Sequence, residues 1–235
     1  MSNLSELANI NPEEGYVLGI DKPYGWTSSD VVRKVKFMLQ HKLKKKNIKV
    51  GHAGTLDPLA TGVLIVCIGK ATKKAESLQA EEKEYVAEIK FGETTPCFDL
   101  EKEVDATYPY EHITKDAIKA ILPLFLGELN QVPPVFSAKM IEGMRAYEFA
   151  RKGQYVEMKP ACITIFDLEI LSFSTPVLTL KIRCSKGTYI RSLARDFGVE
   201  LQSGAHLIGL KRTKSGNTWV EKCFSMEEVE KFLKS

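Results

Sequence analysis

The chain of 235 residues contains 44% hydrophobic residues, enough to bury a core in one large domain or two small ones. Its longest uninterrupted apolar run, Val63 to Ile68, is far shorter than the roughly 20 residues that cross a bilayer, and the N-terminus lacks a basic and then apolar leader. These features favour a soluble cytoplasmic protein without membrane contact, while a net charge of +3 is too small to identify a partner.

The first part of the chain predicts a strand, a helix and a second strand. Tyr16 to Ile20 has the pattern of a short strand, and turn residues followed by Ser and Asp caps introduce a helix from about Asp30 to His41. Apolar residues at helical spacing give this helix one buried face, comprising Val31, Val32, Val35, Met38 and Leu39. A loop punctuated by glycines follows, and then a buried strand over Val63 to Ile68.

The middle of the chain alternates between regular and irregular segments. From Glu84 to Phe91 apolar and polar residues alternate, which is typical of a half-buried strand with Tyr85 pointing inward. Thr95 to Tyr110 has no clear period and predicts a loop. Thr114 begins a helical stretch that Pro123 should bend or end.

The last part predicts helices and a pair of strands. A helix near Met144 to Lys152 ends at Gly153 as a C-cap, and Ala161 to Phe173 and Val177 to Cys184 form neighbouring strands. The turn SKGT starts another helix that directs four residues toward a core, with Arg191 and Arg195 on another side; the four are Ile190, Leu193, Ala194 and Phe197.

The chain ends with a helix that opens with the capping box Ser225 to Glu228 and buries Val229, Phe232 and Leu233. Strands and helices are interspersed without a regular βαβ alternation, and hairpin-like neighbours recur. The sequence therefore predicts an α+β fold with a mixed, largely antiparallel sheet, flanking helices and a central cleft. We expect one catalytic domain over residues 1–235, without repeats or flexible linkers.

The cysteines, histidines and basic residues bound the possible ligands. Five cysteines are scattered singly without a CxxC pair, and four histidines lack zinc-ligand spacing, so we expect reduced thiols and no metal. Basic residues cluster in three runs, each of which could contact phosphates or lie on a solvated face. The runs are Lys42, Lys44, Lys45, Lys46 and Lys49; Lys70, Lys73 and Lys74; and Lys211, Arg212 and Lys214.

The loop GHAGTLDPLATG is the strongest candidate for chemistry. Its glycines permit backbone conformations barred to other residues, and Pro58 moves Asp57 away from helical angles, so the loop can present a carboxylate. Asp57 could equally cap a turn, as Asp before Pro usually does. A nucleotide triphosphatase loop is excluded because six residues, not four, separate Gly62 from Gly69. A glycosidase would need a second carboxylate.

Several long motifs in a fixed order resemble the TruB family of tRNA pseudouridine synthases, which act on uridine 55 in the T loop of tRNA. The motifs cover most of the sequence between Gly15 and Gly216. They read LGIDKPYGWTSSD, GHAGTLDPLATGVLIVCIGKATK, EKEYVAEIKFG, QVPPVFSAKMIEGMRAYEFARKG, KGTYIRSLARDFG and GAHLIGLKRTKSG. The fold that this resemblance implies is the pseudouridine synthase catalytic fold.

The resemblance also implies the chemistry and its residues. Pseudouridine formation cuts the bond from ribose C1′ to uracil N1, turns the base and joins C1′ to C5, so no group is gained or lost and no cofactor or metal is needed. Asp57 matches the catalytic aspartate of the family. Arg191 matches the cation that keeps it ionised and aimed, and Tyr85 matches the aromatic residue that stacks on the base and assists proton transfer.

Four further positions are expected to contribute to substrate binding. His52 resembles the histidine that fills the space vacated by flipped bases, and Leu210 resembles an apolar wall of the pocket. Tyr189 is placed to order the surroundings of Asp57, although both Tyr189 and Leu210 are more simply core residues by composition. Lys22 and the basic runs would contact phosphates of the tRNA T arm.

Because the sequence departs from the family pattern in two places, the family resemblance does not determine how the protein binds RNA. The segment TTPCFDLEK has Pro96 and Cys97 where the family has Asp and Thr, and about 19 residues follow Gly216, too few for a C-terminal RNA-binding domain of the PUA type. We expect a monomer with no obligatory protein partner. The alternatives are a synthase for another RNA, including the guide-dependent branch, and an RNA-binding chaperone that folds tRNA.

Overall fold

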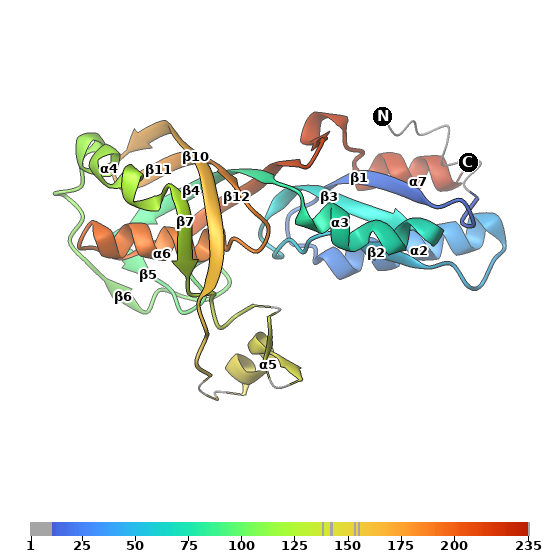
Figure 1. The fold of residues 1–235 in the computed structure, drawn as a ribbon, viewed down its shortest axis with the longest axis horizontal. Helices are drawn as coiled ribbons and strands as arrows, with labels where there is room; N and C mark the ends of the chain where they lie inside the picture. The colour runs from blue at the N-terminus through green and yellow to red at the C-terminus, as the bar shows by residue number, and fades with distance from the viewer. Residues whose placement is uncertain (1–10, 138, 142, 153, 155, 235) are drawn as a thin grey trace. The chain divides into compact units, whose positions relative to one another are not determined.

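The computed structural model describes residues 11–137, 139–141, 143–152, 154 and 156–234 (Figure 1). The chain forms two compact units. Unit 1 contains the described residues up to Tyr85 together with those from Leu210 onward, and unit 2 runs from Val86 to Gly209. In the described residues no helix is long and apolar enough to cross a membrane.

Unit 1 is a small sheet with helices on it. Its elements are β1 (Tyr16–Lys22), α2 (Ser28–Leu43), β2 (Val50–His52), β3 (Thr61–Ile68), η1 (Gly69–Lys74), α3 (Ala75–Ala80), β13 (Thr218–Trp219), η3 (Val220–Lys222) and α7 (Met226–Lys234). Strand β3 pairs antiparallel with both β1 and β2, and parallel with strand β12 (Ala205–Ser215). The parallel register joins Lys211 to Thr61 and Arg212 to Gly62, so the strand after the Asp57 loop is fixed from both sides.

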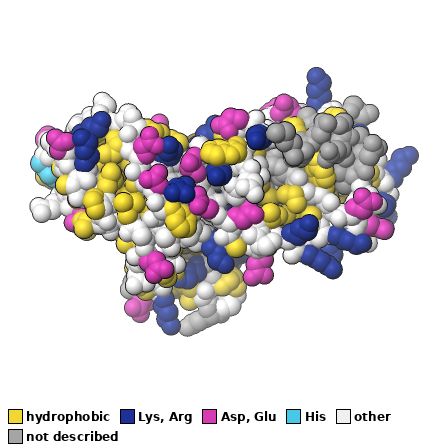
Figure 2. Space-filling view, turned by 45° about the horizontal axis from the view of Figure 1, so that its top comes forward, with side chains coloured by type: hydrophobic (Ala, Val, Ile, Leu, Met, Phe, Trp, Pro, Cys, Tyr) yellow, Lys and Arg dark blue, Asp and Glu magenta, His cyan; other side chains and the backbone are white. Residues whose placement is uncertain are grey.

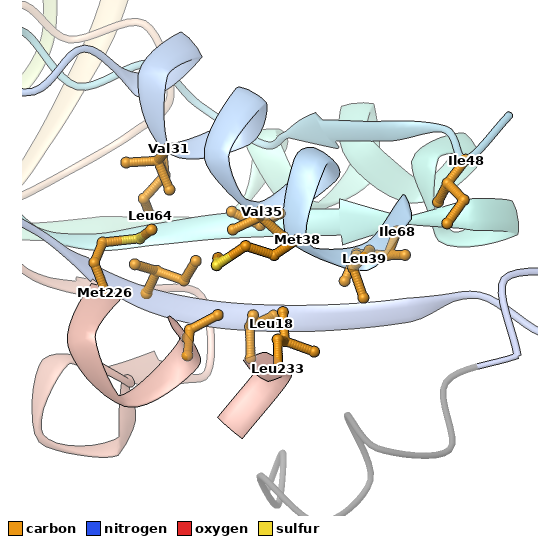
Figure 3. Packing of buried hydrophobic residues seen from close by; sticks show 13 residues of the cluster. Leu18, Val31, Val35, Met38, Leu39, Ile48, Leu64, Ile68, Met226 and Leu233 are labelled. Atoms are coloured by element: carbon orange, nitrogen blue, oxygen red, sulfur yellow. The ribbon is translucent and has the colours of Figure 1, made fainter. Parts of the chain in front are cut away.

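The core of unit 1 explains why β3 reads as a continuous apolar run. Alternate residues of β3 face opposite ways. Those on one face, such as Leu64, pack against Val35 of α2 and Val229 of α7 in the cluster of Figure 3. The other face packs Val63 and Ile65 in a second cluster. A strand buried on both faces needs apolar residues at every position.

Helix α2 begins slightly earlier than the sequence pattern predicts. Its N-cap is Thr27, whose hydroxyl accepts a hydrogen bond from the Asp30 amide at 3.0 Å while the Asp30 carboxylate accepts one from the Thr27 amide at 2.9 Å. Asp30 is therefore the third helical residue, as in a capping box, and the predicted Ser and Asp caps are corrected. This shift places Ser28 inside the first turn, where it is buried.

Unit 2 is built on longer strands. Its elements are β5 (Glu93–Thr94), β6 (Ala106–Thr107), α4 (Lys115–Ile121), η2 (Leu122–Phe125), β7 (Gly127–Gln131), β8 (Met140–Ile141), β9 (Met144–Arg145), α5 (Ala146–Arg151), β10 (Ala161–Ser174), β11 (Val177–Cys184) and α6 (Ile190–Glu200). Strands β4 (Lys83–Phe91) and β12 contribute residues to both units. In unit 2 the strand order is β4, β11, β10, β7, with the last two pairs antiparallel.

Most predicted elements are confirmed. The sheet is mixed and largely antiparallel with flanking helices, as the α+β prediction required. The alternation of β4 buries Tyr85 as predicted, and Pro123 ends α4 in a 3-10 turn. The predicted C-cap Gly153 lies outside the described residues, and the central cleft and the single catalytic domain stay predictions.

Candidate active site

The Asp57 loop connects β2 to β3 and presents its carboxylate at a half-buried position. Within the loop the Ala60 amide donates to the Asp57 carbonyl at 3.1 Å, which closes a turn over Pro58. The preceding Leu56 is buried, with 4% of its surface exposed. The loop thus anchors the Leu56 side chain in the core and holds Asp57 at a half-buried position.

Hydrogen bonds with Ser28, the first residue of α2, and with Gly25, in the turn before it, fix the backbone on either side of Asp57. The Ser28 hydroxyl accepts from the Leu56 amide at 2.9 Å and donates to the Leu56 carbonyl at 3.1 Å. The Gly25 amide donates to the Pro58 carbonyl at 2.9 Å. Because Leu56 and Pro58 flank Asp57, its Cα has little freedom to move.

The structure contradicts the predicted phosphate contact of Lys22. This side chain is completely buried, and its ammonium donates to the carbonyl oxygens of Trp26 at 2.6 Å, Pro23 at 3.0 Å and Pro58 at 3.2 Å. An ammonium has three N–H groups, so all of them are used inside the protein. Lys22 stabilises the loop through the Pro58 carbonyl instead of binding RNA.

Lys22 also contributes positive charge near the candidate catalytic group. Burial lowers the pKa of Lys22 from 10.5 to about 8, although the negative charge of Asp57 acts in the opposite direction. A pKa near 8 leaves the ammonium mostly charged at neutral pH, and a nearby cation favours the ionised form of a carboxylate. Unit 1 therefore places a positive charge near Asp57.

A second basic residue predicted to contact phosphates is also buried. Arg212, in the third basic run, exposes only 1% of its surface, and its guanidinium donates to three backbone carbonyls, those of Val63 at 2.7 Å, Gly54 at 3.0 Å and Thr55 at 3.4 Å. Sequence reasoning missed this role because a run of basic residues is usually exposed.

The other basic residues of the first two runs behave as expected for a surface. Figure 2 shows Lys and Arg side chains on the surface, interspersed with acidic ones. The Gly69 amide donates to the Lys49 carbonyl at 2.7 Å, so the first two runs are neighbours in space. Their exposed members are Lys44, Lys45, Lys46, Lys49, Lys70, Lys73 and Lys74.

The remaining predicted residues of unit 1 occupy three different strands. Tyr85 lies on β4 with 8% of its surface exposed, Leu210 is half-buried on β12, and His52 is half-buried at the end of β2 opposite Val66. Near Tyr85, the Thr213 hydroxyl of β12 donates to the Glu84 carboxylate at 2.8 Å, which ties β4 to β12. The roles assigned to these residues stay predictions.

Arg191 lies in unit 2, buried in the first turn of α6, which corrects the expectation that it lies on a side away from the core. Its guanidinium donates to the carbonyls of Phe136 at 2.8 Å and Cys97 at 3.1 Å. The carboxylate of Asp99, itself 5% exposed, lies 3.6 Å from Arg191 Nε. The predicted approach of Arg191 to Asp57 stays a prediction.

Asp99, which sequence reasoning missed, is a partner of a candidate site residue. It lies in TTPCFDLEK, the segment in which Pro96 and Cys97 depart from the family pattern. A buried arginine requires a compensating charge or several acceptors, and Asp99 with two carbonyls provides both. The only available signal in the sequence was an acidic residue in an otherwise irregular segment.

Tyr189 is positioned through its backbone. The Gln131 amide group accepts from the Tyr189 N–H at 2.8 Å and donates to the Tyr189 carbonyl at 3.1 Å. Gln131 ends β7 and is buried, so this bidentate contact connects that strand to the start of α6. It orients the two residues before Arg191 and thereby the arginine itself.

Comparison with known proteins identifies the family of the chain. Residues 40–190 match the sequence profile described as TruB family pseudouridylate synthase, N terminal domain. The tRNA pseudouridine synthase B of Parabacteroides distasonis is 56% identical over 93% of this chain and 93% of its own length. The protein of the same name from Flavobacterium johnsoniae is 47% identical over 95% of this chain and 100% of its own length.

The fold has counterparts among solved structures. A chain in the crystal structure of a Cbf5-Nop10-Gar1 complex superposes with a TM-score of 0.69 and 28% identity, over 94% of this chain and 54% of that chain. This protein thus spans about half the length of that chain. The sequence and the fold together define a pseudouridylate synthase. The chain belongs to the TruB family.

Proposed function

We propose that this protein converts uridine 55 in the T loop of tRNA to pseudouridine, with Asp57 as its catalytic carboxylate. The observation that carries the proposal is the half-buried side chain of Asp57 on a loop whose backbone is fixed on both sides. The names of the relatives, tRNA pseudouridine synthase B, support the tRNA substrate. The position of the uridine follows from the family resemblance.

The carboxylate of Asp57 acts on the ribose. It either attacks C1′ or takes a proton from the sugar while the bond from C1′ to N1 breaks, and both routes require an ionised carboxylate. The charge of Lys22, whose ammonium donates to the Pro58 carbonyl of the loop, favours this ionised form. Arg191 completes the electrostatic support in the proposed mechanism, and the detached uracil turns before C5 bonds to C1′.

The target base must leave its RNA stack before Asp57 can reach the sugar, at a cost of a few kcal/mol. In the proposed mechanism Tyr85 stacks on the flipped uracil and assists proton transfer at C5. Leu210 walls the pocket and Tyr189 orders its surroundings. His52 fills the space that flipped bases vacate and positions RNA without taking part in proton transfer. His52→Ala should therefore weaken tRNA binding more than it lowers the reaction rate of bound tRNA.

The proposal also covers the location, the oligomeric state and the protein partners of the enzyme. The protein acts in the cytoplasm, as a monomer, without an obligatory protein partner. Light scattering of the purified chain with and without tRNA measures the stoichiometry directly. A stable dimer, or activity that appears only after cell extract is added, would contradict this part of the proposal.

The experiment that tests the function maps pseudouridine chemically in unmodified tRNA after incubation with the purified chain. Asp57→Asn keeps the size of the side chain but removes its charge, so product formation should fall by about a thousandfold or more while tRNA binding is retained. The matched control is Asp116→Asn, because Asp116 is an exposed aspartate on α4.

Each outcome of this experiment separates the alternatives. Product at a position outside the T loop would retire the substrate assignment in favour of a synthase for another RNA. Binding and refolding of tRNA by the native chain without product would favour an RNA-binding chaperone. Full activity of Asp57→Asn would remove Asp57 from the mechanism.

A further inference from the structure

The Arg212 side chain is among the largest that are completely enclosed in this protein, and it lies directly beside the loop of the proposed catalytic carboxylate. We propose that Arg212 is a positioning residue for catalysis: it holds Gly54 and Thr55, just before Asp57, against Val63, just after the loop. This inference rests on the proposed function, because its consequence is the rate of pseudouridine formation.

The geometry of the guanidinium suits this role. Its Nη2 and Nη1 groups donate to the carbonyls of Gly54 at 3.0 Å and Thr55 at 3.4 Å, and Nε donates to the Val63 carbonyl at 2.7 Å. These carbonyls belong to the two ends of the loop that contains Asp57. A planar fork with donors in fixed directions can join two such segments, whereas a lysine ammonium has no comparable fixed geometry.

The backbone of Arg212 holds the same loop a second time. Arg212 pairs with Gly62 in the parallel register between β12 and β3. Gly62 has a φ of +99°, and a Cβ at this position would lie 2.2 Å from the Arg212 carbonyl oxygen. The approach is therefore so close that only glycine fits. Side chain and backbone of one residue enclose the loop between residues 54 and 63.

This arrangement separates catalysis from RNA binding. With 1% of its surface exposed, Arg212 cannot bind a phosphate without leaving its carbonyl partners. Its loss should loosen the loop and let the Asp57 carboxylate sample nonproductive positions. A misplacement of about 1 Å at a reacting group can slow a reaction about a hundredfold.

The test compares Arg212→Lys with Val229→Ala in the full-length protein. Val229 lies in the core of the same unit on α7, so its truncation lowers stability without touching the loop. Single-turnover rates are measured with saturating tRNA at a temperature where both variants are folded. Arg212→Lys should slow product formation about tenfold to a hundredfold with a tRNA Kd within about twofold of the native value, and Val229→Ala should leave both unchanged.

A second variant tests the same contact from the loop. Gly54→Ala imposes strain at a φ of +99°, while its added Cβ would lie 3.6 Å from Arg212 Nη1, an ordinary contact. If Arg212 acts by holding the Gly54 carbonyl, the rate losses of the two variants should not multiply when they are combined. If Arg212→Lys does not fold, Gly54→Ala should still slow the single-turnover rate while retaining the Kd.

The outcomes distinguish this inference from the proposed function. A native chain that forms no pseudouridine defeats the proposed function itself. A native chain that is active together with a folded Arg212→Lys variant of unchanged rate defeats the positioning role alone. So do a weaker tRNA Kd with an unchanged rate, rate losses that multiply in the double variant, and an equal rate loss in Val229→Ala.

Discussion

The two units hold their candidate catalytic side chains in different ways. In unit 1 the carboxylate of Asp57 is positioned through its backbone, because the bonds of Ser28, Lys22 and Arg212 go to main-chain groups of the loop. In unit 2 the guanidinium of Arg191 is itself held, by two carbonyls and the carboxylate of Asp99. The printed contacts of the first arrangement fix the backbone of the loop, and those of the second fix the side chain itself.

This difference follows from what each group must do in the proposed reaction. A carboxylate that acts on a sugar needs an oxygen atom directed at the substrate, and hydrogen bonds to the backbone of its loop position it without occupying that atom. A cation that supplies charge can be restrained by several partners without losing its effect. The buried cations of unit 1 are paired with neutral carbonyls, whereas Arg191 has an ionic partner, and this contrast predicts different responses to mutation.

The largest expected effect comes from the buried ion pair of unit 2. Asp99→Asn removes the carboxylate that lies 3.6 Å from Arg191 Nε, and breaking this buried ion pair should lower the free energy of unfolding by about 3 to 5 kcal/mol. The double variant Asp99→Asn with Arg191→Met should recover most of this loss. Denaturant unfolding followed by circular dichroism measures it, with tryptophan fluorescence as an internal comparison because Trp26 and Trp219 both lie in unit 1. If Asp99→Asn lowered the free energy of unfolding by less than about 1 kcal/mol, the ionic partner of Arg191 would matter no more than the neutral carbonyls around the buried cations of unit 1.

The next effect concerns the pH dependence of unit 1. The pKa of Lys22 is about 8 in the folded protein and 10.5 ordinarily, so the unfolded chain binds more protons between these values and the free energy of unfolding rises with pH in this window. The rise due to Lys22 should be roughly 3 kcal/mol, and Lys22→Met should abolish it. The control Lys231→Met, at an exposed position on α7, should keep the rise. If the free energy of unfolding of Lys22→Met rose with pH as much as that of the native protein, burial would not lower the pKa of Lys22.

A smaller effect separates close packing from backbone strain. Gly62 in unit 1 and Gly187 in unit 2 both have positive φ, at +99° and +81°, but only Gly62 has atoms within 4 Å of an added Cβ. Gly62→Ala should therefore lower the free energy of unfolding by about 2 kcal/mol more than Gly187→Ala, because overpacking adds to a similar strain. Equal losses, measured in urea, would mean that β12 yields to the added methyl group.

The sequence predicted the elements whose patterns repeat over many residues. The alternation of β4, the apolar run of β3 and the capping box of α7 each depend on neighbours in the chain, and all three are confirmed. Strand β12 was missed as an element, because apolar and polar residues do not alternate from Ala205 to Ser215. A motif match identified its residues without predicting its structure.

The candidate site could be predicted only where function depends on residue type alone. A family resemblance identified Asp57, but it could not distinguish Lys22 and Arg212 from surface cations, because burial is a property of the folded chain. The same limit hid the ion pair between Arg191 and Asp99, whose partners are 92 residues apart in sequence. Long-range contacts that satisfy buried charges are the part of the site that only the structure supplies.

The smallest effect tests whether exposed cations of unit 1 serve RNA while the buried ones serve the loop. Lys45, Lys46 and Lys49 are exposed, and each phosphate contact that they make should contribute about 0.7 to 0.9 to the slope of log K against log salt. Replacing all three with Gln should reduce the slope by about 2 and leave the rate of bound tRNA unchanged. Lys231→Gln on α7 is the control, because Glu227, Glu228 and Glu230 surround it in sequence and offset its charge. An unchanged slope in the triple variant would mean that these lysines belong to a solvated face and that RNA is held elsewhere.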